Sequence, residues 1–340
     1  MKNKYNNMKI AGLIILAAVL LSLPFVLGAY YHELIIMLYI NIIVVVSFRM
    51  IAVTGGWSLA HIPLMGVGAY AAALMSKHFG FPFWATLPLG GLASAFVAFI
   101  MSYPLLRMKG FSFFIGSYAA GEAVRLSWIR FRNPFGGPRG LIGIPSPGII
   151  NISGTPLIDF SNDVPFYILT LAITVIILIL LRRFDRSRIG NTLKAISSSD
   201  RLAKSVGINI TYYKALAFIL ASFFNGIAGV LLAHRLGTID PHQFGFTSTL
   251  YLLLWAIIGG TTTFAGPIIG ISALTLIGEL IRRFNEWVPM IYGVILIITV
   301  IFLPEGLESL PKKMPGFFSK LMFSQKSGTG ADKKNSRKLF

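Results

Sequence analysis

Residues 164–181 read VPFYILTLAITVIILILL, a predominantly apolar run without a single charged side chain. A helix of about 20 such residues is long enough to cross the hydrocarbon core of a bilayer. Residues 182–190, RRFDRSRIG, follow directly and are strongly basic. The change from one stretch to the other predicts a transmembrane helix that ends where the chain returns to water.

Comparable apolar runs recur along the chain and predict an all-α polytopic membrane protein. We expect about ten membrane-spanning helices, at residues 10–30, 34–53, 58–76, 84–105, 111–129, 164–181, 214–234, 247–265, 267–284 and 287–303. Gly/Pro-rich runs among them predict some broken or re-entrant segments. Residues 1–310 would form one transmembrane domain, and residues 311–340 a basic, disordered cytoplasmic tail.

The composition supports this fold class. Of the 340 residues, 55% are hydrophobic and only 12% are charged, whereas a soluble domain has about 25% charged residues. Lys and Arg number 30 against 12 Asp and Glu, and they sit beside apolar runs, which favours a membrane partner over nucleic acid. The absence of cysteine excludes a thiolate nucleophile and Cys-based zinc sites.

Four basic regions predict the orientation of the chain. They lie at residues 2–9, 107–109, 182–204 and 312–338. Cytoplasmic loops retain Lys and Arg, and the expected spans place all four regions on one side. We therefore expect a multi-pass inner-membrane protein with both termini in the cytoplasm.

The loop at 130–163 is an exception to this charge rule. It falls on the outer side yet contains Arg130, Arg132 and Arg139. These arginines either pair with nearby acidic residues or face an acidic partner.

A Gly/Pro pattern occurs twice, 204 residues apart. Its members are Gly55, Gly56, Pro63 and Gly66, and then Gly259, Gly260, Pro267 and Gly270. Proline cannot donate to the carbonyl four residues back, and glycine allows close backbone approach. A helix broken within the membrane survives only inside protein or beside a water-filled cavity, so repeated breaks indicate a translocation pathway. The alternatives are an internal duplication and a chance repeat of common membrane residues.

The sequence offers no catalytic constellation. It contains no phosphate-binding G-x-x-x-x-G-K-[ST] loop, and its five histidines lack metal-ligand spacing. We expect no enzyme activity, no cofactor and no metal, so any use of ATP would occur on another polypeptide.

Charges within the expected spans are few. Glu122 and Arg125 lie three residues apart and share a helix face, so they either pair with each other or line a path for a zwitterion. Glu279 and Arg282 repeat the spacing as an expected surface pair. Arg49 lies near a span end, where we expect its side chain to reach toward water.

The segment 182–213 is too patterned for a simple connection. Leu193 and Ile196 share one helix face, and Leu202, Ala203 and Val206 form a second apolar stripe. Ser199 or Asp200 suits the N-cap of the second helix, and Gly207 its C-terminal glycine position. Such an amphipathic helix either docks in a groove of another protein or lies on the membrane surface.

These residues and several other motifs resemble one transporter family. From about residue 40 to 308, the chain is similar to the permease subunits of branched-chain amino-acid ABC importers. The matching motifs are at 54–61 with 66–70, 107–110 with 121–126, 137–145, 187–208 and 303–307.

The resemblance implies a function and a set of partners. The chain would form half of the pore of an ATP-driven importer of leucine, isoleucine and valine. It would act with a second homologous permease, two cytoplasmic ATPases, an extracytoplasmic binding protein and membrane lipid, without nucleic acid. A urea or short-amide permease and a stand-alone secondary transporter are the alternatives.

The residue patterns and the resemblance together predict two groups of site residues. The residues expected to couple to the ATPase are Gly190, Ala195, Asp200, Arg201, Ala203, Gly207 and Ile208. Those expected along the translocation pathway are Gly55, Gly56, Ser58, His61, Pro63, Gly66, Tyr70, Glu122, Arg125, Gly259, Gly260, Pro267 and Gly270.

Overall fold

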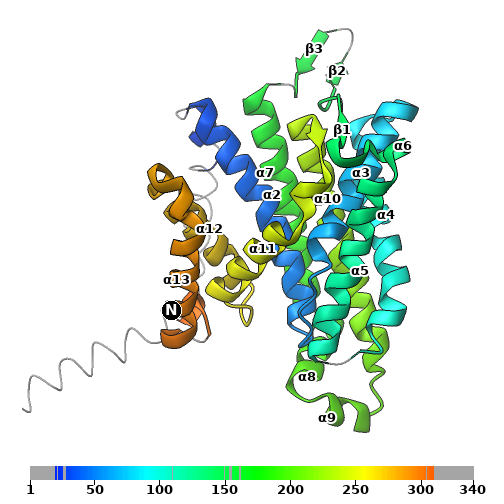
Figure 1. Ribbon diagram of the computed structural model, residues 1–340, viewed down its shortest axis with the longest axis vertical. Coiled ribbons are helices and arrows are strands. Elements are labelled where there is room, and N and C mark those ends of the chain that lie inside the picture. The colour runs from blue at the N-terminus through cyan, green and yellow to red at the C-terminus, as the bar shows by residue number, and fades with distance from the viewer. Residues whose placement is uncertain are drawn as a thin grey trace, which may run out of the picture. The chain divides into compact units, whose positions relative to one another are not determined.

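The computed structural model confirms the all-α fold class (Figure 1). It describes residues 20, 22–25, 28–108, 110–148, 150–152, 155–160, 162–303 and 305–309. The expected first span at 10–30 lies largely outside these residues, and the expected tail at 311–340 lies outside them entirely. The chain divides into two units, up to Trp255 and from Ala256 onward, and each is described by itself.

The first unit contains the longest helices. Its helices are α2 (Ala29–Ala52), α3 (His61–Phe79), α4 (Phe83–Leu105), α5 (Phe111–Arg130), α6 (Arg132–Phe135), α7 (Asp163–Asp185), α8 (Arg188–Ser198), α9 (Asp200–Ser205), α10 (Ile210–Leu236) and the start of α11 (Phe246–Gly259). Short 3-10 turns are η1 (Gly137–Arg139) and η2 (Pro241–Phe244). Two small antiparallel pairs, β1 (Leu141–Ile142) with β4 (Thr238–Ile239) and β2 (Ile150–Ile152) with β3 (Thr155–Ile158), complete it.

Helix α10 is the packing centre of the first unit, where it contacts α2, α3 and α4. Small residues make the close approach possible: a side chain on Gly229 would meet the backbone of Met65, and one on Gly226 would meet Ser94. Membrane helices commonly pack through such small residues, because lipid supplies no hydrophobic drive for association. Ser94 also donates to the Leu64 carbonyl at 2.8 Å.

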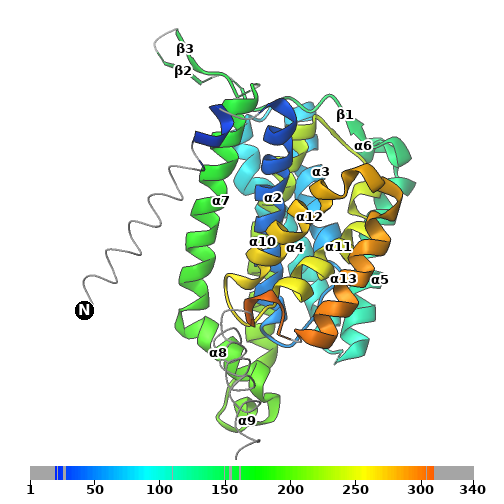
Figure 2. The same ribbon diagram turned by 90° about the vertical axis from the view of Figure 1, so that its left-hand side faces the viewer.

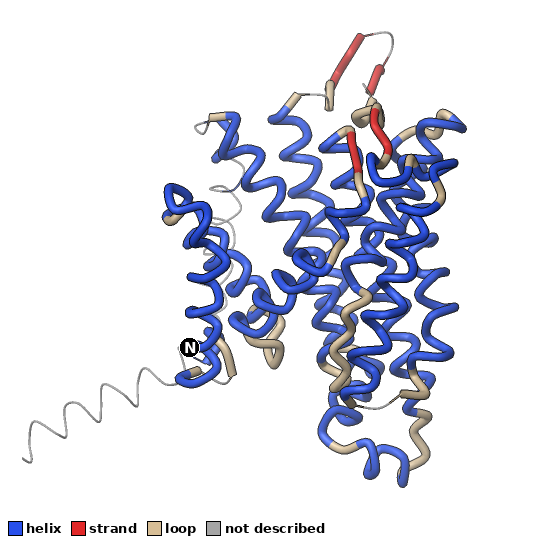
Figure 3. The backbone as a smooth tube through the Cα atoms, in the orientation of Figure 1, coloured by secondary structure: helices blue, strands red, loops and turns tan. Residues whose placement is uncertain are grey.

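Figures 1 and 2 show α8 and α9 at one end of the first unit and the short strands at the other. Figure 3, coloured by secondary structure, shows that most of the described chain is helical and that few residues form strands. At the strand end, Arg235 of α10 pairs with Glu33 of α2 at 2.6 Å and with Asp163 of α7 at 2.8 Å. These ion pairs join three helix ends.

The second unit consists of shorter elements. They are the end of α11, α12 (Gly266–Leu280), η3 (Arg282–Trp287), α13 (Val288–Phe302) and η4 (Leu307–Ser309). Four described helices, α2, α4, α7 and α10, are long and apolar enough to cross a membrane. The apolar helices α11, α12 and α13 have 14, 15 and 15 residues, fewer than the about 20 that a straight crossing needs.

Two expected spans have different limits in the structure. Residues 267–284 are divided between α12, which ends at Leu280, and η3, which begins at Arg282. Residues 247–265 do not form a single helix, because α11 ends at Gly259 and a non-helical stretch leads to Gly266. Gly260 adopts a φ of +90°, a conformation that L side chains rarely adopt and that ends a helix. Apolar residues resume at Phe264 after the break, so hydropathy averaged over the run does not reveal it.

Both copies of the Gly/Pro pattern lie at helix breaks, as expected. The chain leaves α2 after Ala52 and enters α3 with Pro63 in its first turn, and it leaves α11 after Gly259 and enters α12 with Pro267 in its first turn. The first break contains Gly55 at a φ of +78°. An internal duplication stays a prediction.

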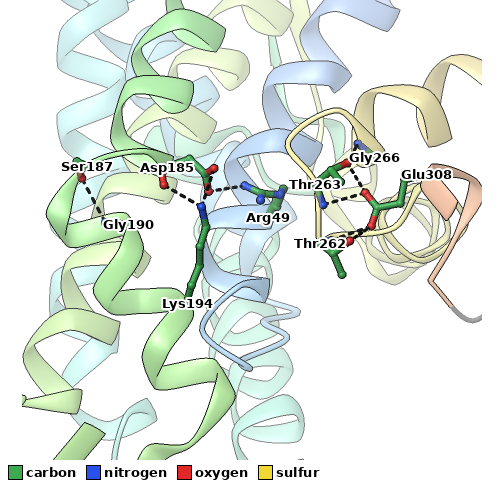
Figure 4. A network of polar contacts seen from close by, with 9 residues as sticks. All are labelled: Arg49, Asp185, Ser187, Gly190, Lys194, Thr262, Thr263, Gly266 and Glu308. Carbon is green, nitrogen blue, oxygen red and sulfur yellow. Dashed lines mark hydrogen bonds and ion pairs between the residues drawn. The ribbon is translucent and has the colours of Figure 1, made fainter. Parts of the chain in front are cut away.

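A buried carboxylate organises the second break. Glu308 is 7% exposed and accepts hydrogen bonds from the backbone N–H groups of Thr262 at 3.0 Å and Thr263 at 2.9 Å, as well as from both hydroxyls (Figure 4). A buried charge is tolerated only when such partners satisfy it. Glu308 thus supplies acceptors to backbone groups that left the helix.

We expect Glu308→Ala to destabilise the protein by about 1.5–3 kcal/mol, since hydrogen bonds to charged groups contribute roughly this much and Glu308 is the shared acceptor of four donors. Thermal unfolding of the purified protein in detergent measures the change. Glu305→Ala is the matched control, because Glu305 is exposed three residues earlier. Equal stabilities of the two variants would contradict this role for Glu308.

Candidate site at the capped basic segment and the helix break

Three side-chain caps divide the basic segment into separate helices. Ser187 accepts from the Gly190 N–H at 3.2 Å, Ser199 from the Leu202 N–H at 3.2 Å, and Asn209 from the Tyr212 N–H at 3.1 Å. Each cap satisfies a backbone donor that the first turn of a helix leaves free. The chain between α7 and α10 therefore becomes α8 and α9 rather than an irregular loop.

Helix α8 buries the apolar face that the sequence predicts. Leu193 and Ile196 are 2% and 1% exposed. Gly190 is also buried, and a side chain there would meet the backbone carbonyls of Phe184 and Asp185 at the end of α7. Only glycine allows α8 to pack this closely against the helix before it.

Helix α9 ends on Gly207 as predicted. Gly207 has a φ of +82°, its N–H donates to the Lys204 carbonyl at 3.0 Å, and the Ile208 N–H donates to the Ala203 carbonyl at 3.1 Å. This pair of bonds is the usual way in which a left-handed glycine closes a helix. The N-cap is Ser199 rather than Asp200.

The residues of the second apolar stripe, Leu202, Ala203 and Val206, differ in exposure. Ala203 is buried at 4% exposure, whereas Leu202 and Val206 are 67% and 70% exposed. The residues expected to couple divide in the same way: Gly190 and Ala203 are buried, Ile208 is half-buried, and Ala195, Asp200, Arg201 and Gly207 are exposed. The outer side of α9 is thus an apolar surface beside exposed polar groups.

A buried ion-pair network connects this region to α2 (Figure 4). Asp185, the last residue of α7, pairs with Arg49 of α2 at 2.9 Å and with Lys194 of α8 at 3.0 Å. The Arg49 side chain is only 3% exposed, so the expectation that it reaches water is wrong. Asp185 gives Arg49 an interior partner, and one carboxylate joins three helices.

Helix α2 leads from this network to the first break. The Leu59 N–H donates to Ser117 of α5 at 2.9 Å, while Ser58 and His61 are fully buried. His61 shares its Nε2 with the Ser47 hydroxyl at 3.0 Å and the Val44 carbonyl at 3.2 Å. Neighbouring helices thus satisfy polar groups at the break.

Other residues expected along the pathway lie in an aromatic cluster. Tyr70 is buried and stacks on Trp128 with ring centroids 4.5 Å apart. A side chain on Gly66 would collide with Trp128 and Phe244, and one on Gly121 would meet Pro63. These contacts show tight packing of α3 against α5, and a role in translocation stays a prediction.

Both expected i, i+3 ion pairs form. The Arg125 Nε donates to the two carboxylate oxygens of Glu122 at 3.1 and 3.0 Å, and both side chains are mostly covered. Glu279 and Arg282 approach to 3.7 Å with Arg282 60% exposed, as expected for a surface pair. Pairing alone does not exclude a second role for Glu122 and Arg125.

The three arginines of the 130–163 loop behave differently. Arg130, Arg132 and Arg139 are exposed, and no ion pair involves them among the residues that the structure describes. Pairing within the described part of the loop is therefore not observed.

Sequence reasoning missed three of the organising side chains: Asp185, Glu308 and Ser117. Asp185 carried a usable signal, since it is the only acidic residue between Arg182 and Lys194. A single carboxylate among cations at a helix end is a candidate partner for an intramembrane arginine. Ser117 and Glu308 carried no such signal, because their partners are backbone groups distant in sequence.

Comparison with known proteins decides the family. Residues 30–303 match the family described as branched-chain amino acid transport system / permease component. The chain belongs to this permease family. It is therefore a transport component and not an enzyme, and it is a multi-pass protein of the bacterial inner membrane.

Individual relatives agree with the family match. The high-affinity branched-chain amino acid transport system permease protein LivM of Salmonella typhimurium is 28% identical over 81% of this chain and 67% of its own length. LivH of Escherichia coli, another permease protein of the system so named, is 27% identical over 41% of this chain and 46% of its own length. A tyrosine transport system permease protein of Clostridioides difficile is 30% identical over 43% and 51%. No solved structure matches this permease.

We expect Asp185→Asn to destabilise the permease by about 3–5 kcal/mol, because Arg49 would lose the carboxylate of a buried ion pair. Asp200→Asn is the control: Asp200 pairs with Lys214 at 3.2 Å but is 54% exposed, and such pairs contribute about 1 kcal/mol or less. Unfolding in detergent compares the two variants. Similar losses for both would contradict a buried, supporting role for Asp185.

Proposed function

We propose that this chain is the transmembrane permease subunit of an ATP-driven importer of branched-chain amino acids. The observation that carries the proposal is the match to the permease family over residues 30–303. The alignment with LivM extends over most of this chain as well. ATP would be hydrolysed on separate cytoplasmic subunits.

The outer face of α9 supports a docking role. Leu202 and Val206 expose two apolar side chains next to each other on a helix that is capped at both ends. A pre-formed helix loses little conformational entropy on binding, which favours recognition by a groove on a partner. We assign that partner as the ATPase subunit.

Contacts inside the first unit suggest how ATPase movement would reach the pore. Displacement of α9 acts on α8 through direct contacts, and α8 is joined to α2 by Lys194, Asp185 and Arg49. Helix α2 ends next to the break at Gly55. Binding and hydrolysis of ATP would then favour different arrangements of that break.

The remaining partners follow from the relatives and the charges. LivM and LivH carry the same system name, which supports pairing of this chain with a second homologous permease. Exposed arginines at 130, 132 and 139 would face an acidic extracytoplasmic binding protein. Both termini and the segment 182–213 would then be cytoplasmic.

Substrate choice has two candidates within the amino acids. The family and LivM support leucine, isoleucine and valine, whereas the tyrosine permease relative supports an aromatic amino acid. Coverage favours the branched-chain amino acids, since LivM aligns with 81% of this chain and the tyrosine permease with 43%.

Uptake of radiolabelled leucine, valine, tyrosine and urea by cells with and without the intact chain tests the substrate. We expect saturable leucine and valine uptake that depends on this chain and on ATP. Urea or tyrosine uptake without leucine uptake would contradict the branched-chain assignment.

We expect the double variant Leu202→Glu with Val206→Glu to reduce co-purification of the ATPase subunit at least about tenfold, because two apolar contacts would become charges in a desolvated interface. Ser197→Glu is the matched control, since Ser197 is exposed on α8 outside this apolar pair. Normal membrane insertion of both variants must be shown. Undiminished co-purification of the double variant would reject α9 as the docking helix.

A further inference from the structure

A cavity of about 630 Å³ lies on the inner side of α9. Its walls come from the end of α2 and the break after it, the α4–α5 connection, α9 and the start of α10. All of these elements belong to the first unit. The volume is within the range of sites for small ligands, roughly 300–1,000 Å³.

The lining of the cavity has an apolar part, called its floor here, and a charged part. Ile51, Phe113 and Phe218 contribute buried apolar side chains to the lining. Arg201, Lys204, Lys214 and Asp200 contribute charged side chains to the same cavity. Three cations against one carboxylate leave an excess of positive charge.

The single carboxylate is already engaged. Both oxygens of Asp200 accept from the Lys214 ammonium at 3.2 Å. Arg201 and Lys204 have no ion pair among the residues that the structure describes. The positive excess therefore resides on these two exposed side chains of α9.

The side chains of α9 therefore form two groups, one exposed to a partner and one lining the cavity. Leu202 and Val206 are largely exposed and do not line the cavity, whereas Arg201 and Lys204 do, together with Ile208 just beyond the helix. A ligand in the cavity would contact the second face while the first stays free. The cavity is thus separate from the exposed Leu202 and Val206 pair assigned to the ATPase, although Asp200, Arg201 and Ile208, which the sequence predicts to couple, line it.

A phosphate ester with an apolar tail matches this combination. Basic pockets at the ends of membrane helices attract anionic headgroups, and the apolar floor accommodates the first carbons of an acyl chain. A zwitterionic amino acid matches less well, because it carries no net charge to balance Arg201 and Lys204. The charge excess and the position at helix ends favour a lipid over a soluble ligand.

We propose that this cavity binds the phosphate headgroup of an anionic membrane phospholipid, held by Arg201 and Lys204 with its first chain carbons on Ile51, Phe113 and Phe218. The bound lipid fills the space between α9 and the break at Gly55 and Gly56, whose residues line the same cavity. It thereby stabilises the position of α9 relative to that break. This inference does not depend on the identity of the transported substrate.

Native mass spectrometry of the purified full-length chain tests the proposal. The protein is delipidated and then titrated with phosphatidylglycerol, with zwitterionic phosphatidylcholine, or with inorganic phosphate. We expect phosphatidylglycerol to be retained preferentially. The double variant Arg201→Gln with Lys204→Gln should bind it about 25-fold more weakly, since each basic side chain near an anionic headgroup contributes about fivefold.

The matched control is Arg186→Gln with Arg188→Gln. These residues are exposed in the same basic segment but do not line the cavity, so the control should retain phosphatidylglycerol like the wild type. Equal losses in both variants would overturn the proposal, since they would indicate only general attraction to basic charge. Retention by the Arg201 and Lys204 variant equal to wild type would also overturn it.

The inorganic phosphate arm distinguishes the source of the headgroup. Failure of millimolar phosphate to displace phosphatidylglycerol supports a lipid, because the apolar floor then contributes to binding. Tight phosphate binding without preference for phosphatidylglycerol over phosphatidylcholine would overturn the lipid assignment. Unfolding temperatures equal to wild type show that lost retention is not misfolding.

Discussion

A backbone N–H or C=O group that leaves a helix needs a new hydrogen-bond partner, and this constraint shapes both helix breaks in the described part of the permease. An unbroken helix satisfies its own backbone, but α2 and α11 end within apolar stretches. Each break therefore needs acceptors and donors from elsewhere in the fold. The first receives the hydroxyl of Ser117, and the second receives the carboxylate of Glu308.

The two solutions differ in charge, and the difference has a physical consequence. Ser117 is neutral and supplies one acceptor to the Leu59 N–H. Glu308 supplies two oxygens to two backbone groups and two hydroxyls. Charge-assisted bonds are roughly twice as strong as neutral ones. The single bond from Ser117 is therefore weaker than the set that Glu308 makes, and the first break is the one connected through α2 to Asp185.

Asp185 has the same kind of role at the end of the bundle. Arg49 is tolerated in a buried position because Asp185 is fixed at the end of α7, and Lys194 brings α8 onto the same carboxylate. The two ion pairs thus link α2, α7 and α8 through one carboxylate. Helix α9 then lies between these three linked helices and the partner that binds its outer face, with a basic cavity on its inner side. Coupling and lipid binding would act on the same six-residue helix from opposite sides.

Much of this fold could be predicted from the sequence because the signals are local. Apolar runs predicted α2, α4, α5, α7 and α10 closely, and the serine and glycine around α9 predicted both of its ends. Such signals depend on backbone hydrogen bonding within a few residues. The expected run at 247–265 failed because hydropathy averages over a window and does not detect one glycine in a left-handed conformation.

The sequence by itself determined that the chain is a membrane protein, where its helices lie and that an amphipathic segment follows the long apolar run at 164–181. Only the tertiary structure decided which polar groups meet: Arg49 with Asp185, the N–H groups of Thr262 and Thr263 with Glu308, and Asp200 with Lys214. It also decided that Leu202 and Val206 face outward while Arg201 and Lys204 line a cavity. The reason is that pairing and burial depend on distances between helices, which no local pattern of residues encodes.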